Sequence, residues 1–107
     1  MVNRIVRMTF EPARVSDFLQ LFEQYRNTIS SVEGCRGVTL LRDLSNPNIF
    51  FTYSLWEGEE FLEKYRKSEL FGIVWPATKR YFAAPAEAWT VTEVPAPISS
   101  NKPQEKV

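Results

Sequence analysis

The stretch IFFTYSLWE, residues 49–57, predicts a strand that is apolar on both of its faces. Successive side chains of a strand point to opposite sides of a sheet. The two faces are Ile49, Phe51, Tyr53 and Leu55, and Phe50, Thr52, Ser54 and Trp56. One small layer of helices covers only one face of a sheet. We therefore expect a second copy of the chain to cover the other face, in a homodimer.

The flanking segments complete a simple order of elements. They are a strand at 2–11, a helix at 12–32, a strand at 37–44, a turn at 45–48, a short helix at 58–68, a last helical piece from Pro76 to Phe82, and a strand at 88–94. This β-α-β-β-α-β order predicts an α+β, ferredoxin-like split βαβ fold, with a four-stranded antiparallel sheet and helices on one face. Residues 1–94 form the expected domain, and the Pro-, Ser- and charge-rich residues 95–107 an expected disordered or extended tail.

Charge and cysteine content limit the partners and the compartment. The chain has 13 basic and 13 acidic residues, without a basic run. A nucleic acid or an anionic membrane surface rewards a concentrated positive face, so we expect neither as a partner. Residues 1–10 alternate polar and apolar, unlike a secretory signal. The single cysteine, Cys35, cannot form an internal disulfide, which favours a cytoplasmic location.

The chain has no histidine. This excludes Ser-His-Asp and Cys-His couples and a proximal-histidine haem ligand, and with one cysteine it disfavours a zinc site. Gly-rich phosphate cradles are also missing among the four glycines. Any chemistry must therefore use carboxylates, Tyr, Lys, Arg, amides or the substrate itself.

Several motifs resemble the antibiotic biosynthesis monooxygenase (ABM) domain family, which includes quinol monooxygenases and belongs to the dimeric α+β barrel proteins. They are Trp56 at the end of a strand, the acidic pair Glu59 and Glu60, YRKSELF at 65–71, WPATK at 75–79, and PAEAW at 85–89. The resemblance covers about residues 2–94. It implies a dimeric α/β barrel that uses O2, with neither metal nor flavin, to oxidise a small aromatic, quinol or polyketide-like substrate.

The resemblance also implies an apolar substrate pocket between the sheet and the helices. The candidate substrate-binding residues are Trp56, Tyr65, Phe71, Trp75 and Phe22. Aromatic stripes at helical spacing are more often core than pocket, so core packing is the competing interpretation of each ring. The Trp75-Pro76 step leaves both interpretations open, because a helix interruption can turn side chains toward a cavity as well as toward the core.

Trp56 is also a candidate for a catalytic role. The polar candidates lie on the predicted strands. Tyr53 could donate its hydroxyl to a substrate oxygen or cap an apolar face. Asp43 is a candidate base for a phenolic proton. Arg42 and Arg7 could hold an oxyanion, but we expect ion pairs with Asp43, Glu11 or a dimer mate instead.

Two other functions fit the same scaffold. One is a non-catalytic dimeric domain that binds a small apolar ligand, and the other is an isomerase or lyase. The fold hosts several activities, so the motifs specify the fold more strongly than the reaction.

Overall fold

The computed structural model describes residues 1–95. Its elements are β1 (Val2–Phe10), a 3-10 turn (Pro12–Arg14), α1 (Val15–Ser30), β2 (Cys35–Arg42), β3 (Ile49–Trp56), α2 (Glu59–Arg66), α3 (Glu69–Lys79) and β4 (Phe82–Val91). The tail expected at 95–107 lies outside the described residues apart from Pro95. No helix within the described residues is long and apolar enough to cross a membrane.

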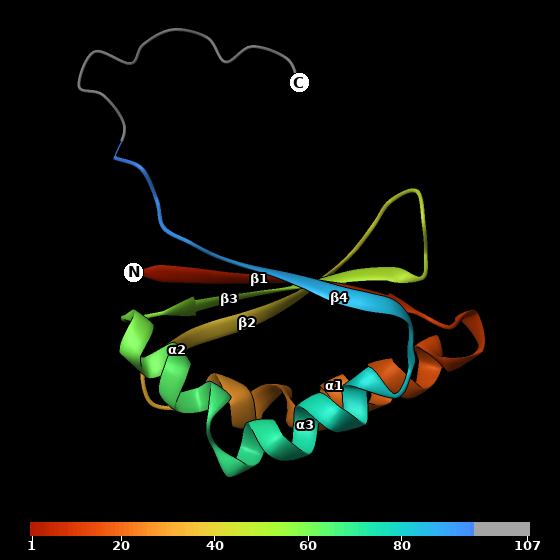
Figure 1. Ribbon diagram of the computed structural model, residues 1–107, viewed down its shortest axis with the longest axis horizontal. Coiled ribbons are helices and arrows are strands. Elements are labelled where there is room, and N and C mark those ends of the chain that lie inside the picture. Colours follow the sequence, from red (N-terminus) through yellow and green to blue (C-terminus); the bar gives the residue numbers. More distant parts are fainter. Residues whose placement is uncertain (96–107) are drawn as a thin grey trace, which may run out of the picture.

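The strands form one antiparallel sheet in the order β2-β3-β1-β4. Helices α1, α2 and α3 lie on the same side of this sheet, below it in Figure 1, and no helix of residues 1–95 lies over the other side. The predicted ferredoxin-like fold is confirmed.

Local sequence signals explain where several elements begin and end. The Ser68 hydroxyl accepts a hydrogen bond from the Phe71 N–H (3.2 Å) and so caps α3, as its position predicts. Gly34 has φ of +81° in the connection between α1 and β2, a conformation that favours glycine. Pro12 occupies the first turn that leads into α1, where its missing N–H costs nothing.

Two predicted boundaries are wrong. Pro76 does not begin a helix but lies inside α3, because the Ser68 cap has already started that helix. The last strand begins at Phe82 rather than at 88, so Phe82 does not end a helix. Pro85 is tolerated in β4 because β4 is an edge strand and its register with β1 shifts between Arg7 and Thr9.

The core lies between the sheet and α1. Its buried members are Met8, Phe10, Phe18, Phe22, Phe50 and Tyr81. The rings of Phe10 and Phe18 stack with centroids 4.0 Å apart and join β1 to α1. On the opposite face of the sheet, Leu41, Tyr53 and Trp89 remain 40–50% exposed. Within residues 1–95 no element covers these large apolar side chains, as the strand pattern predicts.

Candidate functional site

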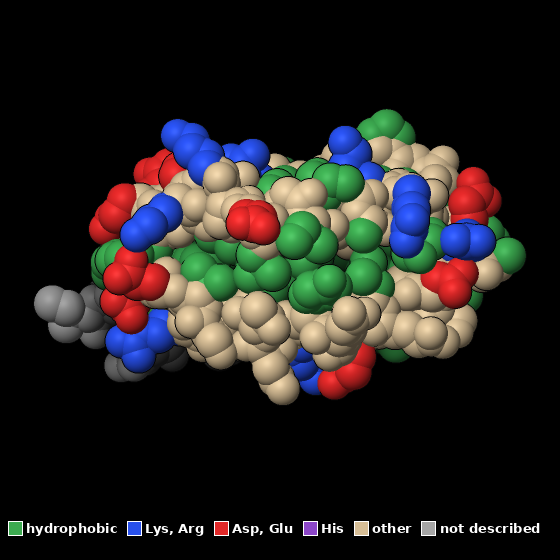
Figure 2. Space-filling view, turned by 90° about the horizontal axis from the view of Figure 1, so that it is seen from below, with side chains coloured by type: hydrophobic (Ala, Val, Ile, Leu, Met, Phe, Trp, Pro, Cys, Tyr) green, Lys and Arg blue, Asp and Glu red, His purple; other side chains and the backbone are tan. Residues whose placement is uncertain are grey.

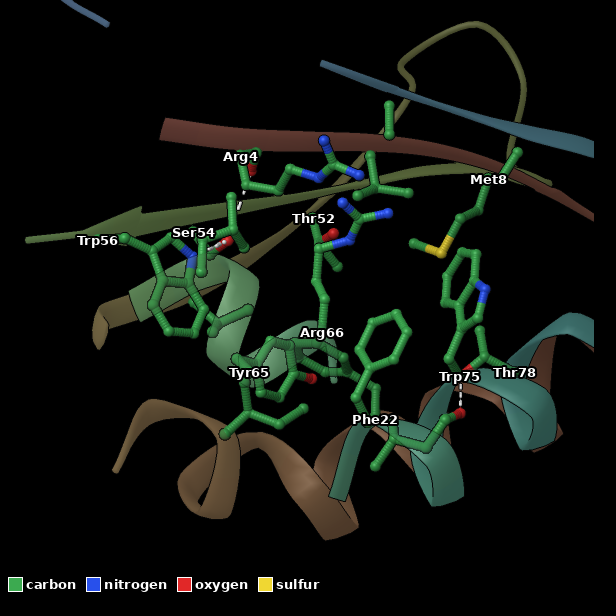
Figure 3. A pocket seen from close by; sticks show the side chains of 18 of the residues that line it. Arg4, Met8, Phe22, Thr52, Ser54, Trp56, Tyr65, Arg66, Trp75 and Thr78 are labelled. Carbon is green, nitrogen blue, oxygen red and sulfur yellow. Dashed lines mark hydrogen bonds between the residues drawn. The ribbon is translucent and has the colours of Figure 1, made fainter. Parts of the chain in front are cut away.

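A cavity of about 260 Å³ lies between the sheet and the helices. Figure 3 shows side chains from both layers pointing into it. The sheet contributes Arg4, Val6, Met8, Val38, Thr52, Ser54, Trp56, Ala86 and Ala88, and the helices contribute Phe18, Phe22, Ile29, Leu62, Tyr65, Arg66, Phe71, Val74, Trp75 and Thr78. From the helix side, Figure 2 shows apolar side chains gathered in a band along the middle of the molecule. The lining is therefore mostly apolar, with a few polar groups.

The rings along one wall of the cavity contact one another in series. Trp56 stacks on Tyr65, with centroids 5.3 Å apart, and Tyr65 meets the edge of Phe71 at the same distance. Phe71 stacks on Trp75 at 5.9 Å, because the two lie four residues apart on one face of α3. With Phe22 from α1, the structure brings all five sequence-predicted substrate-binding residues to this cavity.

Trp56 belongs to both the core and the cavity lining. Its side chain is only 1% exposed, and its indole N–H donates to the Ser54 hydroxyl at 3.0 Å. A buried indole usually needs such a partner for its N–H. The two interpretations of Trp56 given by the sequence are therefore compatible in this structure.

Tyr65 places a phenol at the cavity. Burial raises its pKa to about 12, and the nearby Cys35 thiol adds to the shift through its negative charge when ionised. A phenol at its ordinary pKa is already protonated at neutral pH, and the raised pKa makes this one harder still to ionise. Its hydroxyl can donate a hydrogen bond to a bound oxygen, whereas it is poorly suited to remove a proton.

Arg4 and Arg66 also line the cavity, and neither was singled out from the sequence. Arg4 comes from β1 and donates to the Thr90 hydroxyl at 2.7 Å. Arg66 comes from the last turn of α2 and pairs with Glu63 at 3.0 Å. The sequence held a signal for Arg4, because Arg4, Val6 and Met8 are spaced two residues apart and therefore point to the same face of β1.

The other polar candidates lie away from the cavity. Tyr53 lies on the helix-free face and donates to the Asn3 side chain at 2.8 Å. Asp43 accepts from the backbone N–H groups of the following turn, at 3.0 and 2.8 Å. The Arg42 guanidinium lies 4.6 Å from the centre of the Phe50 ring. None of the three is among the cavity-lining residues.

Arg7 forms an ion pair, as expected, but with a different partner. Its guanidinium lies 2.7 Å from Glu87 on β4. The partner could not be foreseen from the sequence because β4 begins earlier than predicted, which brings Glu87 opposite Arg7 in the β1–β4 register.

Comparison with known proteins identifies the family. The family model described as "Antibiotic biosynthesis monooxygenase" matches residues 1–73. The chain belongs to this family. No curated protein matches it in sequence.

Solved structures share the fold of this family member at low sequence identity. A conserved protein from Methanosarcina mazei is 21% identical, with a TM-score of 0.82 over 88% of this chain and 94% of that one. A structure titled antibiotic biosynthesis monooxygenase is 18% identical, with a TM-score of 0.82 over 89% of this chain and 100% of that one. SnoaB, a cofactor-independent oxygenase from Streptomyces nogalater solved as a mutant, is 18% identical, with a TM-score of 0.78 over 89% and 94%.

Proposed function

We propose that this member of the antibiotic biosynthesis monooxygenase family is a cofactor-independent monooxygenase of a small aromatic or quinol-like substrate. One observation carries the proposal: a cavity walled by stacked aromatic rings, with hydrogen-bond donors at its surface. Such a mostly apolar cavity with a few convergent polar groups is the usual form of a small-molecule site.

The volume of the cavity limits the substrate. An engineered apolar cavity of about 150 Å³ binds benzene, so 260 Å³ accommodates a substituted single ring or a fused pair of rings. A larger polyketide would have to displace part of the wall. The proposal therefore favours benzoquinols and naphthoquinols.

The proposed reaction needs no external reductant. One oxygen atom of O2 converts a ring C–H into C–OH and the other leaves as water, while the quinol loses two electrons and two protons and becomes a hydroxyquinone. All four electrons that reduce O2 therefore come from the substrate. The reaction starts when the ionised substrate passes an electron to O2. The roles of the protein are then to hold the ring, stabilise the oxyanion and exclude water.

Specific residues fit these roles. Trp56, Tyr65, Phe71 and Trp75 would hold a planar ring by stacking and edge contacts. The protonated phenol of Tyr65 would donate a hydrogen bond to a substrate oxygen, and its raised pKa disfavours ionisation. The described lining contains no carboxylate. The substrate would therefore lose its proton to solvent or before it enters.

We also propose that the protein acts as a homodimer in a reducing, cytoplasmic compartment. The helix-free sheet face carries exposed Leu41, Tyr53, Trp89 and Val91, an apolar surface of the kind that pairs with a second copy. The free thiol of Cys35 suits a reducing compartment.

The test is oxygen uptake by the purified protein with a chelator and no added cofactor, across a panel of benzoquinols, naphthoquinols and anthrones. The proposal predicts uptake that scales with protein concentration and yields a hydroxyquinone that contains one labelled oxygen atom when isotopically labelled O2 is supplied. No uptake across the panel would contradict it.

A ligand-binding domain without turnover is the second candidate. The observation that favours it is the lack of a carboxylate base in the described lining. It predicts that naphthoquinols bind in the cavity by calorimetry while oxygen uptake stays at the rate of the buffer.

A further inference from the structure

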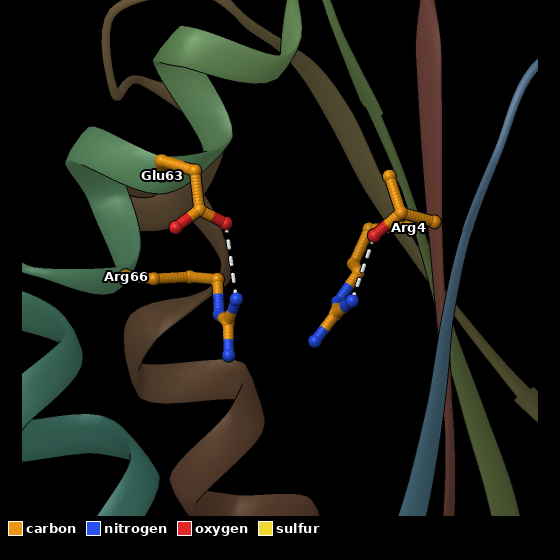
Figure 4. Close-up of polar contacts among 4 residues, drawn as sticks. Arg4, Glu63 and Arg66 are labelled. Carbon is orange, nitrogen blue, oxygen red and sulfur yellow. Dashed lines mark hydrogen bonds and ion pairs between the residues drawn. The ribbon is translucent and has the colours of Figure 1, made fainter.

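Two guanidinium groups reach the cavity from opposite sides. Arg4 projects from β1 in the sheet, and Arg66 projects from the last turn of α2 in the helical layer. Figures 3 and 4 show both side chains directed into the space between the two layers. Their charges are close enough that the positive charge of Arg66 contributes to lowering the pKa of Arg4.

The charges around this pair are not balanced. Arg4 and Arg66 are the only charged residues in the described lining. Arg66 has one carboxylate partner, Glu63, at 3.0 Å. Arg4 donates to the neutral hydroxyl of Thr90, and no carboxylate among residues 1–95 forms an ion pair with it. A net positive charge therefore remains at the cavity.

Partial burial makes this charge costly. Burial is the largest cause that lowers the pKa of Arg4, followed by repulsion from Arg66, while Glu63 acts in the opposite direction. A guanidinium does not lose its proton in proteins. A neutral ligand would remove more water from Arg4 without compensation, whereas an anionic group would replace that water with charge-assisted hydrogen bonds.

We propose that Arg4 and Arg66 bind an anionic oxygen group, either a carboxylate or an ionised hydroxyl, on an aromatic ligand whose ring occupies the cavity. The proposal rests on the proposed function in one respect, that the cavity is the ligand site. The aromatic wall holds the ring while the two guanidiniums hold its charged edge. The pair also favours the ionised form of a hydroxyl ligand, which compensates for the missing carboxylate base.

The test is isothermal titration calorimetry of the full chain with 2-naphthoate and with its neutral analogue 2-naphthalenemethanol. Titration of 2-naphthol below and above its own pKa distinguishes an ionised hydroxyl from a carboxylate. The variants are Arg4→Gln and Arg66→Gln. Arg36→Gln is the matched control, because Arg36 is an exposed arginine, ion-paired with Glu57 at 3.0 Å, that does not line the cavity.

The expected result is that 2-naphthoate binds at least about tenfold more tightly than the alcohol. Each cavity variant weakens naphthoate about tenfold, roughly the loss of one hydrogen bond to a charged group, and leaves the alcohol nearly unchanged. Arg36→Gln changes the affinity for neither ligand. Arg4→Lys and Arg66→Lys bind naphthoate more tightly than the corresponding glutamine variants. Higher affinity of 2-naphthol above its pKa identifies an ionised hydroxyl as an accepted group.

Equal affinity of wild-type protein for naphthoate and the alcohol would overturn the anion site and leave the aromatic cavity in place. Failure of both ligands to bind would overturn the cavity as a ligand site as well. Selective naphthoate binding without oxygen uptake on any quinol would support the anion site while contradicting the proposed oxygenase. The comparison of naphthoate with the alcohol on the wild-type protein tests the anion site even if a variant does not fold.

Discussion

The indole of Trp56 stacks on the phenol of Tyr65, with ring centroids 5.3 Å apart and planes inclined by 27°. This contact joins the end of β3 to the last turn of α2, the turn that also carries Arg66. The same two rings therefore stabilise the fold and line the cavity. A variant that tests ligand binding must leave this contact largely in place.

Trp56→Ala should lower the free energy of unfolding by about 3–5 kcal/mol, the usual cost of truncating a fully buried large aromatic. The side chain is 1% exposed, and its removal also frees the Ser54 hydroxyl. Urea denaturation followed by circular dichroism measures the change. Trp56→Phe, which keeps a ring at this position, should cost clearly less. A cost below about 1 kcal/mol for the alanine variant would show that the ring is not packed as described.

Tyr65→Phe should remove the hydrogen-bond donor without disturbing the stacked rings. If Tyr65 stabilises a developing oxyanion, oxygen uptake should fall by about tenfold or more, with little change in unfolding free energy. Stopped-flow or electrode measurements of kcat and KM on the best quinol give the comparison. Unchanged kcat would remove the phenol from the proposed mechanism.

The raised pKa of Tyr65 also predicts an effect of alkaline pH on stability. The phenol ionises at its ordinary value of 10.0 in the unfolded chain and at about 12 in the folded one. The unfolded state therefore loses this proton first, so the stabilising contribution is complete below pH 10 and is lost as pH rises toward 12. Tyr65→Phe should reduce this alkaline loss, measured as urea unfolding at a series of pH values. Identical pH dependence in the two proteins would contradict the burial of the phenol.

Gly34→Ala should destabilise the fold by roughly 2 kcal/mol or more, because φ of +81° disfavours a side chain and a Cβ there would overlap the Phe61 ring. Gly72→Ala is the matched control. Apart from its two chain neighbours and the backbone of α3 itself, no atom of the described residues lies within 4 Å of a Cβ at Gly72, so alanine should be neutral or stabilising by about 0.5–1 kcal/mol. Chemical denaturation of the two variants tests both expectations, and similar stabilities would contradict them.

Charge on the helix-free sheet face should break the proposed dimer. Trp89→Glu and Leu41→Glu place a carboxylate on two side chains that are 44% and 50% exposed. Light scattering at micromolar concentration should give a dimer mass for the wild type and a monomer mass for these variants. Ile73→Glu is the control, because the Ile73 side chain is 49% exposed on α3, away from that face. This variant should remain dimeric. A monomeric wild type would end the dimer proposal.

The period-two patterns of the strands predicted most of the fold. They placed Phe50 and Trp56 on one face of β3 and Phe51 and Tyr53 on the other, and the structure separates the two pairs in the same way. The boundaries around the two late prolines were not predictable in the same way. The sequence placed a helix start at Pro76 and the last strand after Pro85. In the structure Pro76 lies inside a helix that Ser68 already caps, and Pro85 lies in an edge strand with a shifted register.

The aromatic half of the cavity could be predicted because its rings follow helical spacing and family motifs. The polar half could not be predicted in the same way. Arg4 lines the cavity and Tyr53 does not, because the cavity lies on only one face of the sheet. The face is fixed by where the helices pack, which the strand pattern does not give. Arg66 follows Tyr65 directly in the chain, and one-residue spacing on a helix does not indicate a shared direction.

Filling the cavity gives the most direct test of the central claim that oxygen chemistry occurs inside it. Ala86→Leu adds volume to a half-buried lining residue of β4 without removing any ring or polar group. Oxygen uptake with chelator, on the best quinol of the panel, should fall at least about tenfold in this variant while its unfolding temperature stays close to the wild-type value. Undiminished uptake by a folded Ala86→Leu protein would contradict the account, because the reaction would then occur elsewhere.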